Sequence, residues 1–454
     1  ILVSIDSGPP VSRGYGVVAG MSGSPVYVGG KLIGAVAYTW AFAKRPIAGV
    51  TPIGQMLEAF QPGSSPPRRR GERRPAQAFV LEGQRISRVV VEPSAPARRV
   101  QGELALVPVA TPVLVSGVNP TTLSLLRKAL EPGAVDHVHA RMEPGAAVGA
   151  RLMGGDLDMT AIGTVTYVQG DVVLAFGHSL QSLGTTEMPL VAAWVHGVVP
   201  SAELSVKLAS GGQVVGRITE DRAWSVGGRL GPGPRLVEAA LHVRDLDREV
   251  AHDYRVEVIR NRSLTSALLT TAVAGAIDSV GVPSEGTTRV TLAVEAEGLP
   301  RLVRRNTFAL EEDGGLLALL LGSSAAVMSA TEELSRVLDA LQNSEFGEAK
   351  LQRVAVGIEL SKRRRVARLE RATIAPQRVR AGEEVEITAV LRAANAGATT
   401  RVERVRIPEW CPPGRVQVGI AGGRSADWLR SRLSIADPRP QSLAQMLAQM
   451  LDRP

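Results

Sequence analysis

The sequence is poor in cysteine and in aromatic residues, and each shortage narrows the choice of protein class. The lone Cys411 excludes an internal disulfide framework and a metal site built from cysteines. Aromatic residues make up only 4% of the chain, so Val, Leu, Ile and Ala must fill its cores, which favours β-structure. Uninterrupted apolar runs long enough for a membrane-spanning helix are also missing. We therefore expect a β-rich protein without an integral membrane segment.

Lysine is scarce as well, occurring at only six positions, so arginine supplies nearly all of the positive charge. The formal net charge is +8, and the arginines are scattered along the chain at modest density. Nucleic-acid binding needs basic side chains gathered on one face, usually with stacking aromatic residues beside them. We therefore expect no nucleic-acid partner.

The length of 454 residues and the 44% of hydrophobic residues predict about three globular domains. Residues 1–60 alternate short apolar runs with glycine turns, and Gly29-Gly30 predicts a β-hairpin. Residues 61–78 combine Pro, Gly, Ser and Arg without periodicity and read as a linker. Residues 79–140 indicate a mixed α/β insertion, whose helix follows Asn119.

Residues 141–283 carry short strands with glycine turns, which predict a barrel or a sandwich. Residues 284–350 read as a strand and helix connector, and residues 351–454 as a C-terminal β-sandwich with a tail helix. The tail helix either docks on this last domain, the interpretation we adopt, or binds a partner. The connector helix is expected after a capping box of Ser329 and Glu332, with one apolar face made by Leu334, Val337, Leu338 and Leu341.

The stretch "GMSGSP", from Gly20 to Pro25, raises the question of chemistry. A serine hydroxyl is a weak nucleophile unless a base takes its proton and hydrogen-bond donors stabilise the oxyanion that follows. The flanking glycines permit a tight turn in which the amides of Gly20 and Ser22 converge on one point. The same pattern also fits an ordinary Gly/Ser turn between strands, so the residues alone leave both interpretations open.

A general base is the second requirement, and His178 is the histidine with an informative context. It follows the strand pattern "GDVVLAFGH", which places an imidazole at a strand end. The residues alone favour a capping or satisfied core histidine at that position over a catalytic one. His137 and His139 alternate in "DHVHA", but no Cys, His or carboxylate partner stands at a recognisable metal-ligand spacing, so we expect no metal site.

Taken together, "GMSGSPVYVGGKLIGAVAY" and "AIGTVTYVQGDVVLAFGHSL" resemble the SpoIVB-type serine peptidases of the S55 family, relatives of trypsin-like enzymes. The resemblance covers residues 1–60 and about 141–260. It implies that Ser22 is the nucleophile, that His178 is the base and that Asp6 orients the histidine. It also implies an oxyanion hole from the Gly20 and Ser22 amides, and makes Ser24 structural. In this chain Asp6 and Ser22 precede His178, whereas the family's histidine comes first.

Further expectations follow from the same resemblance. "AGVTPI" resembles the strand that lines the substrate cleft of trypsin-like folds, which assigns Gly49, Val50 and Thr51 to substrate binding. No cofactor is implied, the partner is a protein or peptide substrate, and autoprocessing fits the family. An exported or cell-envelope location is implied too. Because the sequence starts at Ile1 without a charged leader, we expect any export signal to lie upstream.

The sequence as a whole therefore predicts a mainly β protein with a trypsin-like double β-barrel of permuted order, an additional α/β segment and a C-terminal β-sandwich. The expected function is that of a serine endopeptidase acting through an acyl-enzyme. The alternative is a non-catalytic, β-rich peptide-binding scaffold or sensor that retains a peptidase fold.

Overall fold

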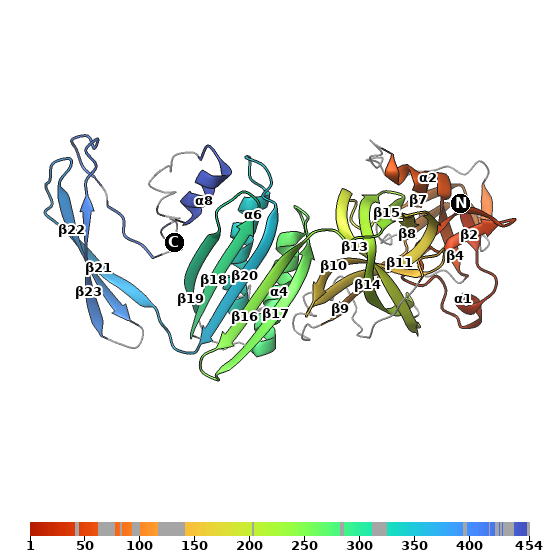
Figure 1. Cartoon of the computed structure of the whole chain (residues 1–454), viewed down its shortest axis with the longest axis horizontal. Helices are drawn as coiled ribbons and strands as arrows, with labels where there is room; N and C mark the ends of the chain where they lie inside the picture. The colour runs from red at the N-terminus through yellow and green to blue at the C-terminus, as the bar shows by residue number, and fades with distance from the viewer. Residues whose placement is uncertain are drawn as a thin grey trace. The chain divides into compact units, whose positions relative to one another are not determined.

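The computed structural model is mainly β (Figure 1). The largest sheet formed by the described residues has twelve strands. The chain divides into two compact units, Ile1–Glu238 with Arg255–Leu268, and Ala239–Tyr254 with Leu269–Pro454. The structure describes residues 1–40, 45–61, 78–81, 84–92, 100–116, 141–201, 204–281, 286–310, 325–393, 397–416, 418–422, 426, 429 and 440–451. The predicted linker, the helix after Asn119 and the pair His137 and His139 lie almost entirely or entirely outside these residues.

The first unit contains a six-stranded sheet that carries the serine motif. Its strands run in the order β1 (Leu2–Ser4), β4 (Ile47–Pro52), β3 (Lys31–Thr39), β8 (Glu103–Pro108) and β7 (Arg88–Val91), and β2 (Pro25–Val28) pairs with β3. Gly29 and Gly30 join β2 to β3 with φ angles of 56° and 76°. Positive φ at both central residues is the requirement of a type I′ hairpin turn, and β2 pairs antiparallel with β3, so the predicted hairpin is confirmed.

The same unit also contains a ring of six strands that closes on itself. The pairings run through β10 (Ala147–Gly155), β13 (Gly184–Val199), β14 (Val206–Arg222), β15 (Ser225–Leu230), β12 (Val172–Ala175) and β11 (Asp158–Gln169), which pairs again with β10. A sheet whose last strand returns to its first is a barrel. The six-stranded sheet of the serine motif, in contrast, stays open within the described residues, so a second closed barrel is not seen there.

Short elements complete the first unit. They are α1 (Pro9–Ser12), α2 (Ile53–Leu57), η1 (Glu58–Phe60), β5 (Phe79–Leu81), β6 (Gln84–Ile86) and β9 (Val113–Ser116). β9 pairs antiparallel with the first residues of β11, from Asp158 to Ala161. Phe60, at the end of η1, packs on the same apolar cluster as Met56 and Leu174 and thereby joins the open sheet to the ring.

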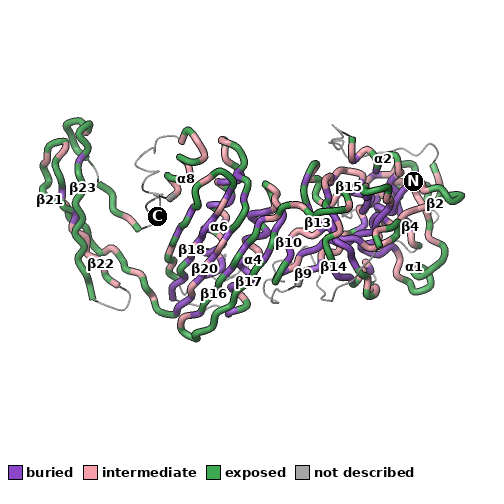
Figure 2. The backbone as a smooth tube through the Cα atoms, in the orientation of Figure 1, coloured by how far each residue is buried: buried purple, intermediate pink, exposed green. Residues whose placement is uncertain are grey.

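The second unit is a sheet with helices on one face (Figures 1 and 2). Its strands run in the order β19 (Leu302–Leu310), β18 (Gly286–Ala296), β20 (Leu351–Ser361), β16 (Leu236–Asp245) and β17 (Val250–Ile259). Of the last two strands, the parts Ala239–Asp245 and Val250–Tyr254 belong to this unit. Residues of β16 alternate strictly between buried and exposed from Val237 onward, as expected when one face of a sheet is covered and the other meets water. The covering helices are α4 (Thr265–Val280) and α6 (Ala325–Gln342), which share a hydrogen bond between Thr270 and Ser335.

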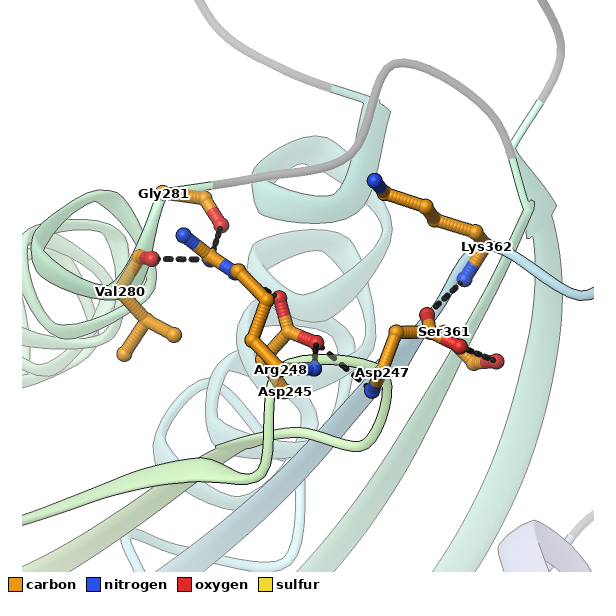
Figure 3. A network of polar contacts seen from close by, with 7 residues as sticks. All are labelled: Asp245, Asp247, Arg248, Val280, Gly281, Ser361 and Lys362. Carbon is orange, nitrogen blue, oxygen red and sulfur yellow. Dashed lines mark hydrogen bonds and ion pairs between the residues drawn. The ribbon is translucent and has the colours of Figure 1, made fainter.

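The turn between β16 and β17 is tied to the end of α4 (Figure 3). The Arg248 guanidinium donates to the carbonyls of Val280 and Gly281, the second at 2.7 Å. Buried Asp245 holds that guanidinium through Arg248 Nε at 2.7 Å. The last carbonyls of a helix have no intrahelical donor, so an arginine placed there satisfies them. This polar network fixes the carboxyl end of α4.

The C-terminal part differs from the expected β-sandwich over 351–454. β20 pairs with β18 along its whole length, so it belongs to the helix-covered sheet. The strands that follow form one antiparallel sheet of β21 (Ala367–Ala375), β22 (Glu384–Ala393) and β23 (Ala398–Arg406), and the described residues show no second sheet packed against it. The tail helix α8 (Leu443–Leu451) contacts β19, where Arg304 donates to the Met450 carbonyl.

The connector helix confirms its predicted face but not its predicted start. Leu334, Val337, Leu338 and Leu341 are all buried, as the apolar spacing requires. The helix begins at Ala325, a turn before the expected capping box, so Ser329 lies inside it and is no cap. No helix among the described residues is long and apolar enough to cross a membrane.

Candidate functional site

Ser22 lies in a tight turn, Gly20 to Ser24, which we call the serine turn. Gly20 and Gly23 have φ angles of 90° and 91°, a region that residues with a side chain rarely adopt. Within the turn the Ser24 amide donates to the Met21 carbonyl at 2.9 Å, and the Gly23 amide donates to Val36 of β3 at 2.7 Å. The glycines of the motif are therefore needed for the path of the backbone around Ser22.

The serine turn packs directly against the barrel strand β11 and against the chain at Phe176, which follows β12 and precedes His178. The Ser22 carbonyl accepts the Thr164 amide of β11 at 2.9 Å, and the Gly23 carbonyl accepts the Thr166 hydroxyl at 2.7 Å. A Cβ added at Gly23 would overlap the Thr164 carbonyl and the Phe176 amide. Phe176 stands two residues before His178, so the two sequence motifs lie side by side.

The Ser22 hydroxyl is buried and has no partner. The exposed fraction of Ser22 is 0%, and its Oγ makes no hydrogen bond with any residue that the structure describes. The Gly20 amide, expected to help bind an oxyanion, donates instead to the Ala110 carbonyl at 2.9 Å. In this conformation the serine turn therefore does not offer both amides of the predicted oxyanion hole.

His178 is held as a neutral imidazole with a free lone pair. Its Nδ1 lies 2.7 Å from the Ser179 carbonyl, which can only accept, so the proton is assigned to Nδ1. Nε2 is buried and makes no hydrogen bond with the described residues, Ser22 included. Burial lowers the pKa of His178 below 6.5, against the opposing effects of the Ser179 and Val109 carbonyls and of the Asp221 charge. This tautomer leaves Nε2 able to accept a proton at neutral pH.

Asp6, the expected acid, is exposed and accepts a hydrogen bond from the Ser4 hydroxyl at 2.7 Å. None of the contacts described for His178 involves it. The carboxylate whose charge acts on His178 belongs to Asp221 at the end of β14, which is fully buried. Among the described residues the structure thus brings Ser22 and His178 into one region, with Asp221 rather than Asp6 as the acidic neighbour of the histidine.

The strand assigned to substrate binding is occupied on both sides. β4 lies between β1 and β3, where Gly49 pairs with Leu2 and the Val50 amide donates to the Ile1 carbonyl at 2.7 Å. An extended peptide cannot add to Gly49 and Val50 while β1 is in place. Thr51 has a different contact, because its hydroxyl donates to the Gly177 carbonyl at 2.7 Å, one residue before His178.

Lys207 is a largely buried amine under the serine turn. It lies on β14, and its Nζ donates to the Gly20 carbonyl at 2.7 Å and to the Thr164 hydroxyl at 3.1 Å. Burial lowers the pKa of Lys207 to about 8. Because one of these contacts ends on the Gly20 carbonyl, the amine fixes the position of the Gly20–Met21 peptide at the start of the serine turn.

We expect the stability of the first unit to rise between pH 8 and pH 10. Lys207 has a native pKa of about 8 against 10.5 for the ordinary lysine, so in this window the unfolded chain binds more protons than the native one. The gap corresponds to on the order of 3 kcal/mol in the free energy of unfolding. Urea unfolding followed by tryptophan fluorescence should show this rise in the wild type and much less of it in Lys207→Met. Lys31→Met, at an exposed position, is the control, and equal slopes in all three proteins would contradict the prediction.

Sequence reasoning missed Asp221, Lys207 and the threonine hydroxyls that hold the site. Lys207 could have been noticed in the sequence, because it is one of only six lysines in the chain and lies within a predicted strand. Asp221 carried no such signal, since "TEDRAW" is typical of an ordinary polar strand end.

The described residues contain no group of His, Cys, Asp and Glu that could hold a metal ion. No protein-family model, curated protein or solved structure matches the chain.

Proposed function

We propose that the chain is a serine endopeptidase in which Ser22 is the nucleophile and His178 the general base. The observation that carries this proposal is the pairing of two buried, partnerless groups on adjoining segments, a hydroxyl and an imidazole nitrogen that keeps its lone pair. A buried polar atom without a partner calls for an explanation, and a catalytic role is one such explanation. Other described residues also carry partnerless buried atoms, so it is the closeness of these two on adjoining segments that supports the proposal. The closed barrel beside an open sheet is compatible with a trypsin-like arrangement with the site between them.

The reaction follows from these two groups. Ser22 Oγ forms a bond to the scissile carbonyl carbon while His178 Nε2 takes its proton. Collapse of the tetrahedral intermediate breaks the C–N bond, and the same proton goes to the departing amine. Water then hydrolyses the acyl-enzyme by the same route in reverse. The oxyanion needs the Ser22 amide and, once it has released the Ala110 carbonyl, the Gly20 amide.

The closed state of the site sets a condition on activity. Because Ser22 is fully buried, a substrate reaches it only after a covering segment has moved, and the hydrogen bond from Ser22 to His178 forms at that stage. The same burial also favours a second candidate function, a peptide-binding scaffold that keeps the peptidase site shut. The two functions differ in whether Ser22 ever reacts.

A fluorophosphonate probe distinguishes these functions, since it modifies only an activated serine. We expect the wild type to be labelled, with the mass increase located on the peptide that contains Ser22, and Ser22→Ala to stay unlabelled. Ser24→Ala is the matched control, because Ser24 contributes backbone hydrogen bonds to the turn that alanine retains. A wild type that remains unlabelled at every pH between 6 and 9 would support the scaffold.

A further inference from the structure

Asp221 is a fully buried carboxylate that holds the loop following His178. Its Oδ1 accepts the Leu180 amide at 2.7 Å, and its Oδ2 accepts the Gln181 and Leu183 amides at 2.9 Å and 3.1 Å. A carboxylate taken out of water is stable only when its oxygens are fully hydrogen-bonded, and here three backbone donors satisfy it. The loop in turn cannot move without breaking three charge-assisted hydrogen bonds.

The chain around His178 needs such an anchor because its backbone is strained. Phe176 and Ser182 have φ angles of 67° and 57°, in the left-handed region that is unfavourable for residues with a side chain. Strained backbone persists only where the surroundings fix it from several sides. Thr51 holds the chain before His178 through the Gly177 carbonyl, and Asp221 holds the chain after it.

The loop that Asp221 anchors also determines the protonation of the imidazole. Ser179 stands between His178 and the three bonded amides, and its carbonyl accepts the Nδ1 proton at 2.7 Å. The negative charge of Asp221 also acts on His178, raising its pKa against the effect of burial. A catalytic histidine needs a fixed tautomer, and it also needs a nearby negative charge that stabilises the imidazolium.

Building on the proposed roles of Ser22 and His178, we propose that Asp221 is the positioning residue of the site. It replaces the directly bonded carboxylate of a triad by acting through the loop of Leu180 to Leu183 and the Ser179 carbonyl. Asp6 does not supply this function, because it is exposed and bonded to Ser4. The histidine is thus oriented by an acid that follows it in the chain.

The test compares Asp221→Asn with the wild type in two measurements on the full chain. The first is the second-order rate of fluorophosphonate labelling at Ser22, which we expect to fall at least tenfold. The second is the ¹⁵N spectrum of histidine-labelled protein, with the His178 signal assigned from His178→Gln. We expect the wild type to show the Nδ1–H tautomer at pH 7, and Asp221→Asn to show a mixture of tautomers and a lower pKa of His178.

Matched variants separate positioning from a general loss of structure. Asp245→Asn removes a second buried carboxylate that accepts backbone amides, but in the other unit, and should change the labelling rate less than twofold. Asp221→Glu keeps the charge and should recover part of the rate. If Asp6→Asn lowers the rate while Asp221→Asn does not, the proposal is overturned.

The ¹⁵N spectrum tests the role of Asp221 without requiring that the protein be active. Its wild-type part also does not depend on whether any variant folds. An Nε2–H tautomer in the wild type at pH 7 overturns the role of Asp221 without any substitution. If the wild type is not labelled by the probe, the peptidase proposal fails. The tautomer change in Asp221→Asn then still decides whether this carboxylate orients His178.

Discussion

Replacing Gly23 with alanine is expected to destabilise the first unit by about 2–5 kcal/mol and to abolish labelling of Ser22. Two effects add at this position. The φ angle of 91° is unfavourable for alanine by roughly 1–2 kcal/mol. The added Cβ would also overlap the Thr164 carbonyl and the Phe176 amide, which are backbone atoms of the barrel and cannot turn aside, and overpacking of this kind costs about 1–3 kcal/mol. Urea unfolding and the labelling rate measure the two outcomes.

Gly30→Ala is the control that isolates the overlap. Gly30 has a φ angle of 76°, yet nothing lies within 4 Å of the position that its Cβ would take. This variant therefore carries the backbone strain alone and should lose about 1 kcal/mol while it keeps its labelling. Equal losses of stability in the two variants, or normal labelling of Gly23→Ala, would show that the serine turn is not packed against the barrel as described.

The elements that the sequence predicted well are those determined by local chemistry. Gly29 and Gly30 formed the expected hairpin because glycine adopts, without a steric penalty, the positive φ angles that a type I′ turn between two adjacent strands requires. The face of α6 was predicted because apolar residues three and four apart lie on one side of a helix, whatever that side contacts. Ser22 and His178 were singled out by a resemblance and by strand-end patterns, and the structure brings their segments together.

Long-range pairing explains what the sequence could not predict. The alternating pattern of Val354, Val356 and Ile358 identifies a strand but says nothing about its partner, and β20 pairs with β18 rather than with the strands that follow it. Asp221 is invisible for the same reason, since its role depends on amides some forty residues away. Asp6 and the strand at Gly49 were placed by analogy, and the described contacts give them other partners.

In the second unit, the buried ion pair of Arg304 and Glu333 is the place where we expect a substitution to lower stability strongly. Arg304 Nε lies 2.6 Å from Glu333 Oε1, and the side chains are only 6% and 1% exposed. The pair links β19 to α6, and Arg304 also donates to the Met450 carbonyl of α8. We expect Glu333→Ala to lower the stability of this unit by about 3–5 kcal/mol, because it leaves a guanidinium buried without its carboxylate. Hydrogen exchange of the β19 and α6 amides measures the loss.

Two further variants show whether the loss comes from the unpaired charge. Glu332→Ala changes the neighbouring residue of the same helix, whose side chain is 53% exposed, and should stay within about 0.5 kcal/mol of the wild type. Replacing both partners by apolar residues, Arg304→Met with Glu333→Leu, removes the buried charge and should recover most of the stability of β19 and α6. The α8 amides should nevertheless exchange faster in this double variant, since the donor to Met450 is gone. If the double variant is as unstable as Glu333→Ala, packing rather than charge holds α6 on the sheet.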